Sequence, residues 1–148
     1  MSDNIEIKID NKAVEEALLK VASKCEDLRP LMKNIAGIMA DAVEENFEQE
    51  GRPDKWQELA ESTIKKRKKT KHWPGKILQV EGQLATSITT QYDNESAVIG
   101  SNLAYAAIHQ LGGQAGKGKK VKIPARPYLK IEDIEKTTIF EEINKYLK

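Results

Sequence analysis

The sequence predicts an α+β domain in which amino-terminal helices and a carboxy-terminal helix pack on a small antiparallel sheet. Three observations carry this prediction. An apolar stripe at helical spacing runs from Leu31 to Phe47, β-forming residues flank a turn within residues 87–100, and a last helical pattern opens at Asp133 or Glu132. Helices at both ends of a chain, with strands between them, are typical of the α+β class. Because 148 residues is the size of one ordinary domain, we expect a single domain over residues 1–148.

The amino-terminal part begins with an alternation of isoleucine and charged residues over residues 5–9. This period of two predicts a short half-buried strand. Asp10 or Asn11 can then cap a first helix that runs to about Lys24.

A second and longer helix is the clearest element of the sequence. Pro30 suits its first turn, and the Leu31–Phe47 stripe supplies one apolar face. Gly51 and Pro53 follow at the positions where a helix ends.

A third, shorter helical stretch starts near Trp56 and Leu59 and leads into the run Lys65–Lys71, which has six bases in seven positions. Such a run could neutralise phosphates. The alternative is a solvated helix end, and we prefer it because Trp73 is the only aromatic residue close by. We therefore expect the run to be exposed and not to be a specific DNA site.

The carboxy-terminal half combines a hairpin, a short helix and a glycine-rich loop. Residues 87–92 and 97–100 flank Asp93 and Asn94, which predicts a β-hairpin. A helix from Ala104 should end at Gly112-Gly113. We expect core anchors at Trp56 and along one face of this helix: Tyr105, Ile108 and Leu111.

Residues 112–120 hold glycines and lysines without an apolar anchor, which predicts a mobile loop. Extended structure resumes at Val121–Ile123 and Tyr128–Ile131, so the predicted sheet contains the 87–100 hairpin and a strand within residues 121–131. Pro124–Pro127 interrupts it as an edge segment, because proline donates no hydrogen bond to a strand ladder. The final helix continues to Leu147.

The formal net charge of +1 hides a segregation of charge. Residues 1–50 hold 12 acids and 6 bases, whereas residues 51–76 hold 9 bases and 3 acids. This polarity suits head-to-tail contact between copies, and equally suits helices that pack within one copy. No signal peptide or membrane-spanning run is recognisable, and the single cysteine, Cys25, fits a small buried hydrophobe.

The residues give no support for an enzyme, a metal site or a cofactor site. Two histidines and one cysteine have no ligand spacing, and no nucleophile elbow, phosphate loop or dinucleotide motif is present. We read His109 as structural, since a lone histidine on a helix is usually packed or hydrogen-bonded. We expect no catalytic, cofactor-binding or metal-binding residue.

Four motifs follow one another in the carboxy-terminal half: Gly82–Leu84 with Ser87-Ile88, Val98–Asn102, Tyr105–Gly113 and Ile123–Leu129. Upstream, the second helix is followed by a matching set: Phe47, Gly51-Arg52, Trp56, Leu59 and Thr63. This order resembles the phage virion morphogenesis family, which includes Mu-like protein G and tail completion proteins, over about residues 30–135. The resemblance implies a structural virion component without cofactor or catalysis.

The expected function is therefore tail completion or head–tail joining in a tailed bacteriophage or prophage, through an oligomeric ring of identical copies. A head-side neck or stopper protein and a basic nucleic-acid-binding module are the alternatives. Expected partners are the chain itself and phage tail-tube or neck proteins, with no membrane and no specific nucleic acid. Assembly is expected in the host cytoplasm, followed by residence in the virion. The expected subunit-contact residues are Gly112, Gly113, Lys117, Lys119, Lys120, Pro124, Arg126 and Pro127. Arg126 could pair with a carboxylate of its own fold or of the next copy.

Overall fold

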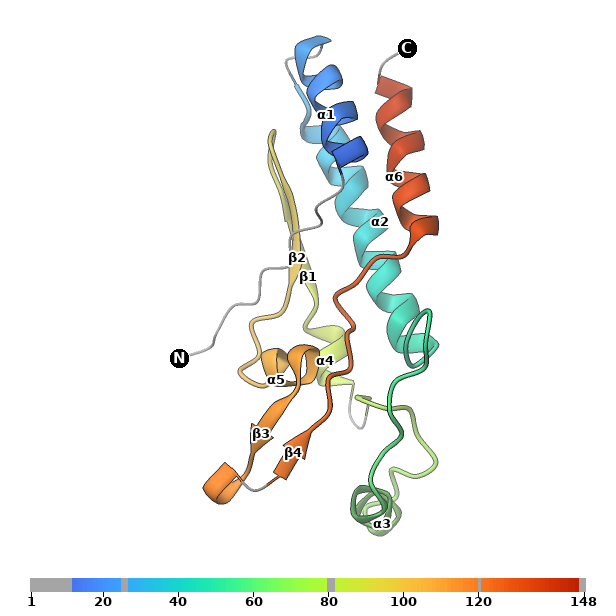
Figure 1. The fold of residues 1–148 in the computed structure, drawn as a ribbon, viewed down its shortest axis with the longest axis vertical. Helices are drawn as coiled ribbons and strands as arrows, with labels where there is room; N and C mark the ends of the chain where they lie inside the picture. Colours follow the sequence, from blue (N-terminus) through green and yellow to red (C-terminus); the bar gives the residue numbers. More distant parts are fainter. Residues whose placement is uncertain (1–11, 25–26, 80–81, 120, 147–148) are drawn as a thin grey trace. The chain divides into compact units, whose positions relative to one another are not determined.

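A computed structural model describes residues 12–24, 27–79, 82–119 and 121–146 (Figure 1). The described chain divides into two compact units, each assembled from segments that are distant in sequence. Unit 1 is made of residues 44–88 and 101–128, and unit 2 of residues 12–43, 89–100 and 129–146. The expectation of a single domain over the whole chain stays a prediction. The strand expected within residues 5–9, its neighbouring helix cap and Cys25 lie outside the described residues.

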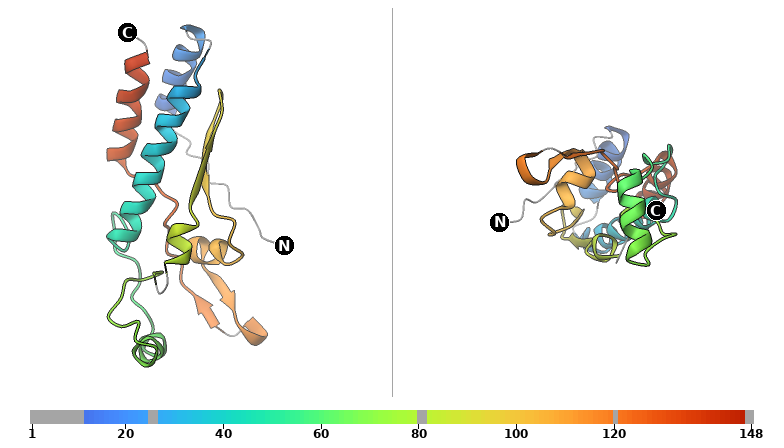
Figure 2. Two further views of the ribbon diagram at one scale, coloured as in Figure 1. Left: turned by 180° about the vertical axis from the view of Figure 1, so that it is seen from behind. Right: turned by 90° about the horizontal axis from the view of Figure 1, so that it is seen from below.

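Unit 2 is built around three helices, α1 (Lys12–Lys24), most of α2 (Arg29–Glu48) and α6 (Asp133–Tyr146). All three confirm the helices predicted from apolar spacing. Seen from behind in Figure 2, α1, α2 and α6 lie side by side. Their apolar faces meet in one core, in which Val21, Leu31 and Ile143 have no exposed surface. Burying such side chains contributes about 1.5–3 kcal/mol each, which is why the three helices pack together.

The hairpin of unit 2 confirms the prediction from turn chemistry. Strand β1 (Thr89–Tyr92) pairs antiparallel with β2 (Ala97–Gly100). In the turn, Oδ1 of Asp93 accepts hydrogen bonds from the backbone N–H groups of Glu95 and Ser96, both at 2.7 Å. Tyr92 and Ile99 pack against the helical core.

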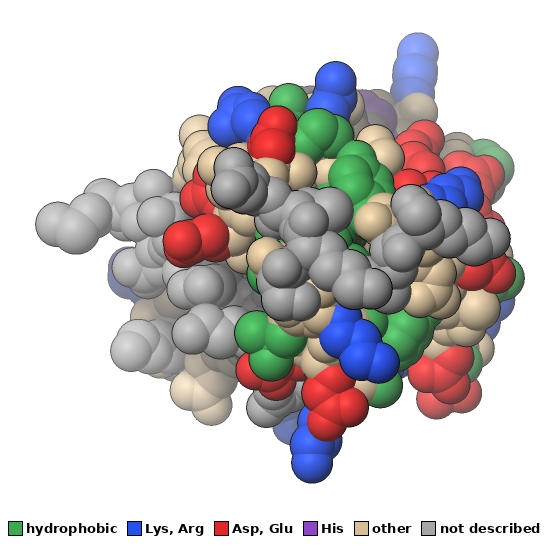
Figure 3. All heavy atoms as spheres, turned by 90° about the horizontal axis from the view of Figure 1, so that it is seen from above, with side chains coloured by type: hydrophobic (Ala, Val, Ile, Leu, Met, Phe, Trp, Pro, Cys, Tyr) green, Lys and Arg blue, Asp and Glu red, His purple; other side chains and the backbone are tan. Residues whose placement is uncertain are grey.

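Figure 3 shows charged side chains of both signs, with hydrophobic side chains exposed between them, on the face seen from above.

Unit 1 consists of short elements around the carboxyl end of α2. They follow in this order: α3 (Glu61–Lys69), α4 (Gln83–Thr86), α5 (Ala106–Leu111), β3 (Gly113–Ala115), the 3-10 turn η1 (Lys117–Lys119) and β4 (Val121–Ile123). Strands β3 and β4 pair antiparallel, with Gly113 opposite Ile123. This hairpin extends beyond α5 in Figure 1.

Three details of the predicted architecture are wrong. The described strands form two separate two-stranded sheets, not one sheet that joins the 87–100 hairpin to residues 121–131. Residues 128–131 form no strand, and the backbone of Tyr128 is bonded to the side chains of Asn46 and Gln110. Residues 113–119 form β3 and η1, where a loop without secondary structure was expected. The mobility of this segment stays a prediction.

Candidate functional site

Tyr128 lies at the centre of unit 1 and is fully buried. Its hydroxyl donates to the carbonyl oxygen of Ala106 at 2.6 Å, and its backbone N–H donates to Oε1 of Gln110 at 3.0 Å. Its carbonyl oxygen accepts from Nδ2 of Asn46 at 2.8 Å. Tyr128 therefore joins α5 to the end of α2 through three polar contacts, while its ring packs on Phe47 with centroids 5.2 Å apart.

Trp56, an expected core anchor, is 6% exposed. Its indole Nε1 donates to the carbonyl oxygen of Pro127 at 3.1 Å, and its ring meets Phe47 edge-on at 5.8 Å. The turn before it requires Gly51, whose φ is +112° and where a Cβ atom would lie 2.6 Å from the backbone nitrogen of Trp56. Only glycine accepts that approach.

The side chain of Arg126 points into its own fold. Its Nε donates to the carbonyl oxygen of Gln57 at 3.0 Å and its Nη2 to that of Glu58 at 3.1 Å. Its backbone N–H donates to the carbonyl oxygen of His109 at 2.8 Å. Arg126 is only 6% exposed, and no carboxylate of the described residues forms an ion pair with it. The planar guanidinium fork thus holds main-chain oxygens that precede α3.

Arg67 is a second buried arginine, and it corrects the expectation that the whole Lys65–Lys71 run is exposed. Its side chain is 6% exposed, while the neighbouring lysines of α3 are exposed. Nη1 donates to the carbonyl oxygen of Lys76 at 2.9 Å. Its Nε is buried without a hydrogen-bond partner among the described residues. One member of the basic run is therefore inward-facing.

Both arginines line one cleft of about 430 Å³, which we call the arginine cleft. Lys122 of β4 adds a third basic side chain, and His109 of α5 also lines the cleft. Four leucine and isoleucine side chains are part of the lining: Leu59, Leu78, Leu84 and Ile123. None of the described lining residues is acidic.

Burial and like charge govern the titration of these groups. Desolvation lowers the pKa of Arg126, and the nearby charge of Arg67 lowers it further. Desolvation also lowers the pKa of Arg67, against an opposing effect of Glu50. The pKa of His109 is lowered by burial and then by the nearby charge of Arg126, which favours the neutral imidazole. Burial raises the pKa of Tyr128 to about 12.

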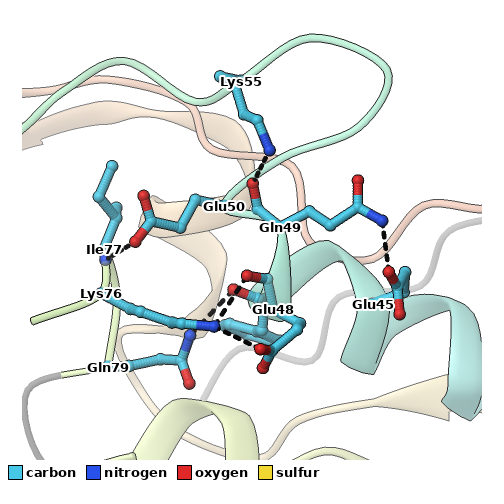
Figure 4. A network of polar contacts seen from close by, with 9 residues as sticks. Glu45, Glu48, Gln49, Glu50, Lys55, Lys76, Ile77 and Gln79 are labelled. Atoms are coloured by element: carbon cyan, nitrogen blue, oxygen red, sulfur yellow. Dashed lines mark hydrogen bonds and ion pairs between the residues drawn. The ribbon is translucent and has the colours of Figure 1, made fainter.

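A polar network fixes the end of α2 beside the cleft (Figure 4). Nζ of Lys76 contacts both the carbonyl oxygen and Oε1 of Glu48, at 2.9 and 2.7 Å. Nε2 of Gln79 donates to the carbonyl oxygen of Phe47 at 3.0 Å, and Oε1 of Glu50 accepts from the backbone N–H of Ile77 at 3.3 Å. These contacts satisfy carbonyl groups that a helix end leaves without partners.

The predicted contact segment lies mostly at the surface. Gly112 makes the expected sharp exit from α5, with φ of +75° and a Cβ position 2.9 Å from the backbone nitrogen of Ala125. Gly113 and Lys117 are exposed. The side chain of Lys119 and all of Lys120 lie outside the described residues. Pro124 lines the arginine cleft, and Pro127 offers its carbonyl to Trp56.

The expected anchoring face of α5 is wrong for two of its three residues. Tyr105 is 39% exposed and Leu111 is 68% exposed, while Ile108 is half-buried. The helix instead buries Ala106 and Gln110, which are four positions apart. The close approach of Tyr128 explains this choice, because it requires a small residue at 106 and an amide acceptor at 110.

Sequence reasoning missed three residues of this centre. Asn46 is fully buried, Gln110 is 7% exposed, and Arg67 was read as part of a solvated run. For Asn46 a signal existed, since a polar residue beside Phe47 interrupts the buried end of the apolar stripe. The basic run contains no comparable signal that singles out Arg67.

The described residues contain no group of three or more histidine, cysteine or acidic side chains placed to hold a metal ion. Within the same described part of the chain, no helix has the length and apolar character needed to cross a membrane.

Comparison with known proteins gives one family. The model of the phage virion morphogenesis family matches residues 9–148. The chain is 42% identical to "Mu-like prophage FluMu G protein 2" of Haemophilus influenzae, with 97% of this chain and 96% of that protein covered. It is 33% identical to "Putative capsid assembly protein G" of Escherichia phage Mu, with 98% and 95% covered. No solved structure matches.

Proposed function

This chain belongs to the phage virion morphogenesis family, and we propose that it completes the tail or joins head and tail by forming an oligomeric ring. The observation that carries the proposal is the breadth of the match, since the family covers residues 9–148 and two phage or prophage proteins align over nearly their whole length. The proposed role is structural, without catalysis or cofactor. The proposed partners are further copies and tail-tube or neck proteins.

The distribution of charge supports assembly from identical copies. Unit 1 carries 14 bases and 8 acids, a net charge of +6, whereas unit 2 carries 12 acids and 8 bases, a net charge of −4. Opposite charges on two parts of one chain favour a heterologous contact, in which one part of each copy meets the other part of the next. A ring results when the rotation between copies closes.

A head-side role is the second candidate, and one observation favours it. The phage Mu relative is named for capsid assembly, not for the tail. A neck or stopper protein on the head side would share the proposed ring but contact the portal end of the capsid. The difference between the two candidates is therefore the particle to which the ring binds.

The experiment is a null allele of the gene in its own phage, complemented from a plasmid. We expect induced cells to release heads and tails that do not form infectious particles, and plasmid expression to restore them. Electron microscopy of the lysate shows which part is defective. Mixing purified wild-type heads or tails into the null lysate then identifies the deficient partner. Normal particle yield and infectivity without the gene would refute the proposed function.

The exposed lysines of α3 require a separate test, because a basic nucleic-acid-binding module would use them. We expect only weak, sequence-independent DNA binding that falls steeply with salt. Sequence-specific binding at physiological salt would favour that module over a structural role. Fluorescence anisotropy with several labelled duplexes measures both quantities.

A further inference from the structure

We propose that the arginine cleft of unit 1 binds a carboxylate side chain from unit 2 of a second copy of this chain. This inference rests on the proposed function, because it names the site at which copies join. The site is defined by three residues: Arg67 of α3, Lys122 of β4, and Arg126 in the segment that follows β4.

The donors of the cleft are held in place before any ligand binds. Arg126 is fixed by its bonds to the carbonyl oxygens of Gln57 and Glu58, and Arg67 by its bond to that of Lys76. Arg67 still has a buried Nε–H without an acceptor among the described residues. Its side chain is 6% exposed, so bulk water reaches it poorly. An unsatisfied buried donor is unfavourable, which favours a small rearrangement that brings it an acceptor oxygen.

Charge gives the second argument. Three basic side chains line the cleft, and the described lining holds no acid to balance them. Glu50 raises the pKa of Arg67 by less than burial lowers it. In addition, Oε1 of Glu50 already accepts a hydrogen bond from the backbone N–H of Ile77. Buried charges are normally paired, because removing them from water is unfavourable. The arrangement therefore favours an anionic ligand.

The lining of the cleft favours a carboxylate over a nucleic-acid phosphate. Leu59, Leu84 and Ile123 line the cleft together with the basic groups, which suits the aliphatic stem of an acidic side chain. A guanidinium group donates to carboxylate oxygens, and Arg67 has an N–H group without an acceptor in the described part of the chain, whereas Nε and Nη2 of Arg126 already donate to main-chain oxygens. Duplex phosphates are instead met by exposed lysine and arginine side chains, and here both arginines are buried.

The occupant follows from the charge of the two units. Residues 101–128 of unit 1 contain five bases and no acid, while unit 2 has a net charge of −4. Unit 2 also carries exposed acids, among them Glu95 in the β1–β2 turn and Asp133 at the start of α6. A second copy thus supplies the carboxylate, and its own cleft remains open for the next copy.

The first test compares charge reversals that differ only in position. Lys122→Glu places an acid in the cleft, and Lys68→Glu places one on an exposed site of α3 that does not line it. Sedimentation velocity of the full-length protein should show association weakened at least about tenfold by Lys122→Glu. Lys68→Glu should change it much less. Equal effects of the two variants would overturn the proposal.

A second variant tests the buried donor. Arg67→Gln should weaken self-association more than about tenfold, because the opposing carboxylate then lacks its main partner. Thermal unfolding of the same samples shows whether the variant is folded. If Arg67→Gln does not fold, the Lys122→Glu comparison alone decides. Wild-type protein that remains monomeric up to millimolar concentration would also overturn the proposal.

Photo-crosslinking identifies the occupant. The photoreactive amino acid p-benzoylphenylalanine at position 122 of the full-length chain should give crosslinks to residues of unit 2 in another copy. Crosslinks confined to DNA or to a different protein would overturn the assignment to a second copy, as would their absence in an oligomer. If these crosslinks are absent but the wild-type gene still complements the null allele, this site alone is rejected. If the null allele causes no defect in particle assembly, the proposed function is rejected instead.

Discussion

Replacing Asn46 by alanine tests the polar centre of unit 1 most directly. The Asn46 side chain is fully buried, and both ends of its amide are hydrogen-bonded. Its Nδ2 donates to the carbonyl oxygen of Tyr128 at 2.8 Å, and its Oδ1 accepts from Nε of Arg52 at 2.7 Å. Alanine removes both contacts and leaves space where the amide stood.

The expected loss of stability is about 2–4 kcal/mol. A typical hydrogen bond contributes about 0.5–1.5 kcal/mol net, and a buried carbonyl left without its donor adds about 1–3 kcal/mol. The carbonyl of Tyr128 is the larger contribution, because this residue has no exposed surface. Arg52 is only half-buried, so water can replace the acceptor that it loses.

Urea unfolding followed by tryptophan fluorescence measures this loss, since Trp56 packs against Phe47 beside Asn46. Asn102→Ala is the matched control, because Asn102 is exposed and should change stability by less than about 0.5 kcal/mol. Asn46→Asp separates the two contacts: a carboxylate still accepts from Arg52 but cannot donate to Tyr128. A change below about 0.5 kcal/mol for Asn46→Ala would refute the assignment of a structural role to this side chain.

Three further predictions follow from the same unit. Burial raises the pKa of Tyr128 from 10.0 to about 12, so the contribution of its neutral phenol to the free energy of unfolding is fully present below pH 10. We expect about 2–3 kcal/mol of this free energy to be lost as the pH rises through 12. Tyr128→Phe should lack this alkaline loss in unfolding experiments. Replacing the exposed α3 lysines, Lys65, Lys66, Lys68 and Lys69, by glutamine should change the melting temperature little, whereas Arg67→Gln alone should lower it clearly, and calorimetry compares the two. Gly112→Ala should lose roughly 1–3 kcal/mol in urea unfolding, because the Cβ atom meets the backbone of Ala125 at positive φ; Gly37→Ala, which has open space in a helix, is its control and should not destabilise.

Elements that depend on neighbouring residues could be predicted from the amino-acid sequence. Helix α2 follows from the apolar stripe between Leu31 and Phe47 and from the glycine after it, and α6 from a similar repeat. The β1–β2 hairpin follows from Asp93, whose carboxylate organises a turn of neighbouring residues. The order of motifs over residues 82–129 was enough to indicate the family, since it needs no knowledge of how they pack.

Which polar side chains are buried, and what they bind, depends on contacts between distant segments and could not be predicted from the sequence. Asn46 meets Tyr128 across 82 positions of sequence, and Arg126 meets Gln57 across 69. The spacing of residues along the chain does not indicate such distant partners. Arg67 therefore could not be distinguished from the lysines around it, and Tyr105 and Leu111 were predicted to be buried although they are exposed. Each of these buried polar groups is stable because a distant segment supplies its hydrogen bonds, and the arginine cleft forms where those segments meet.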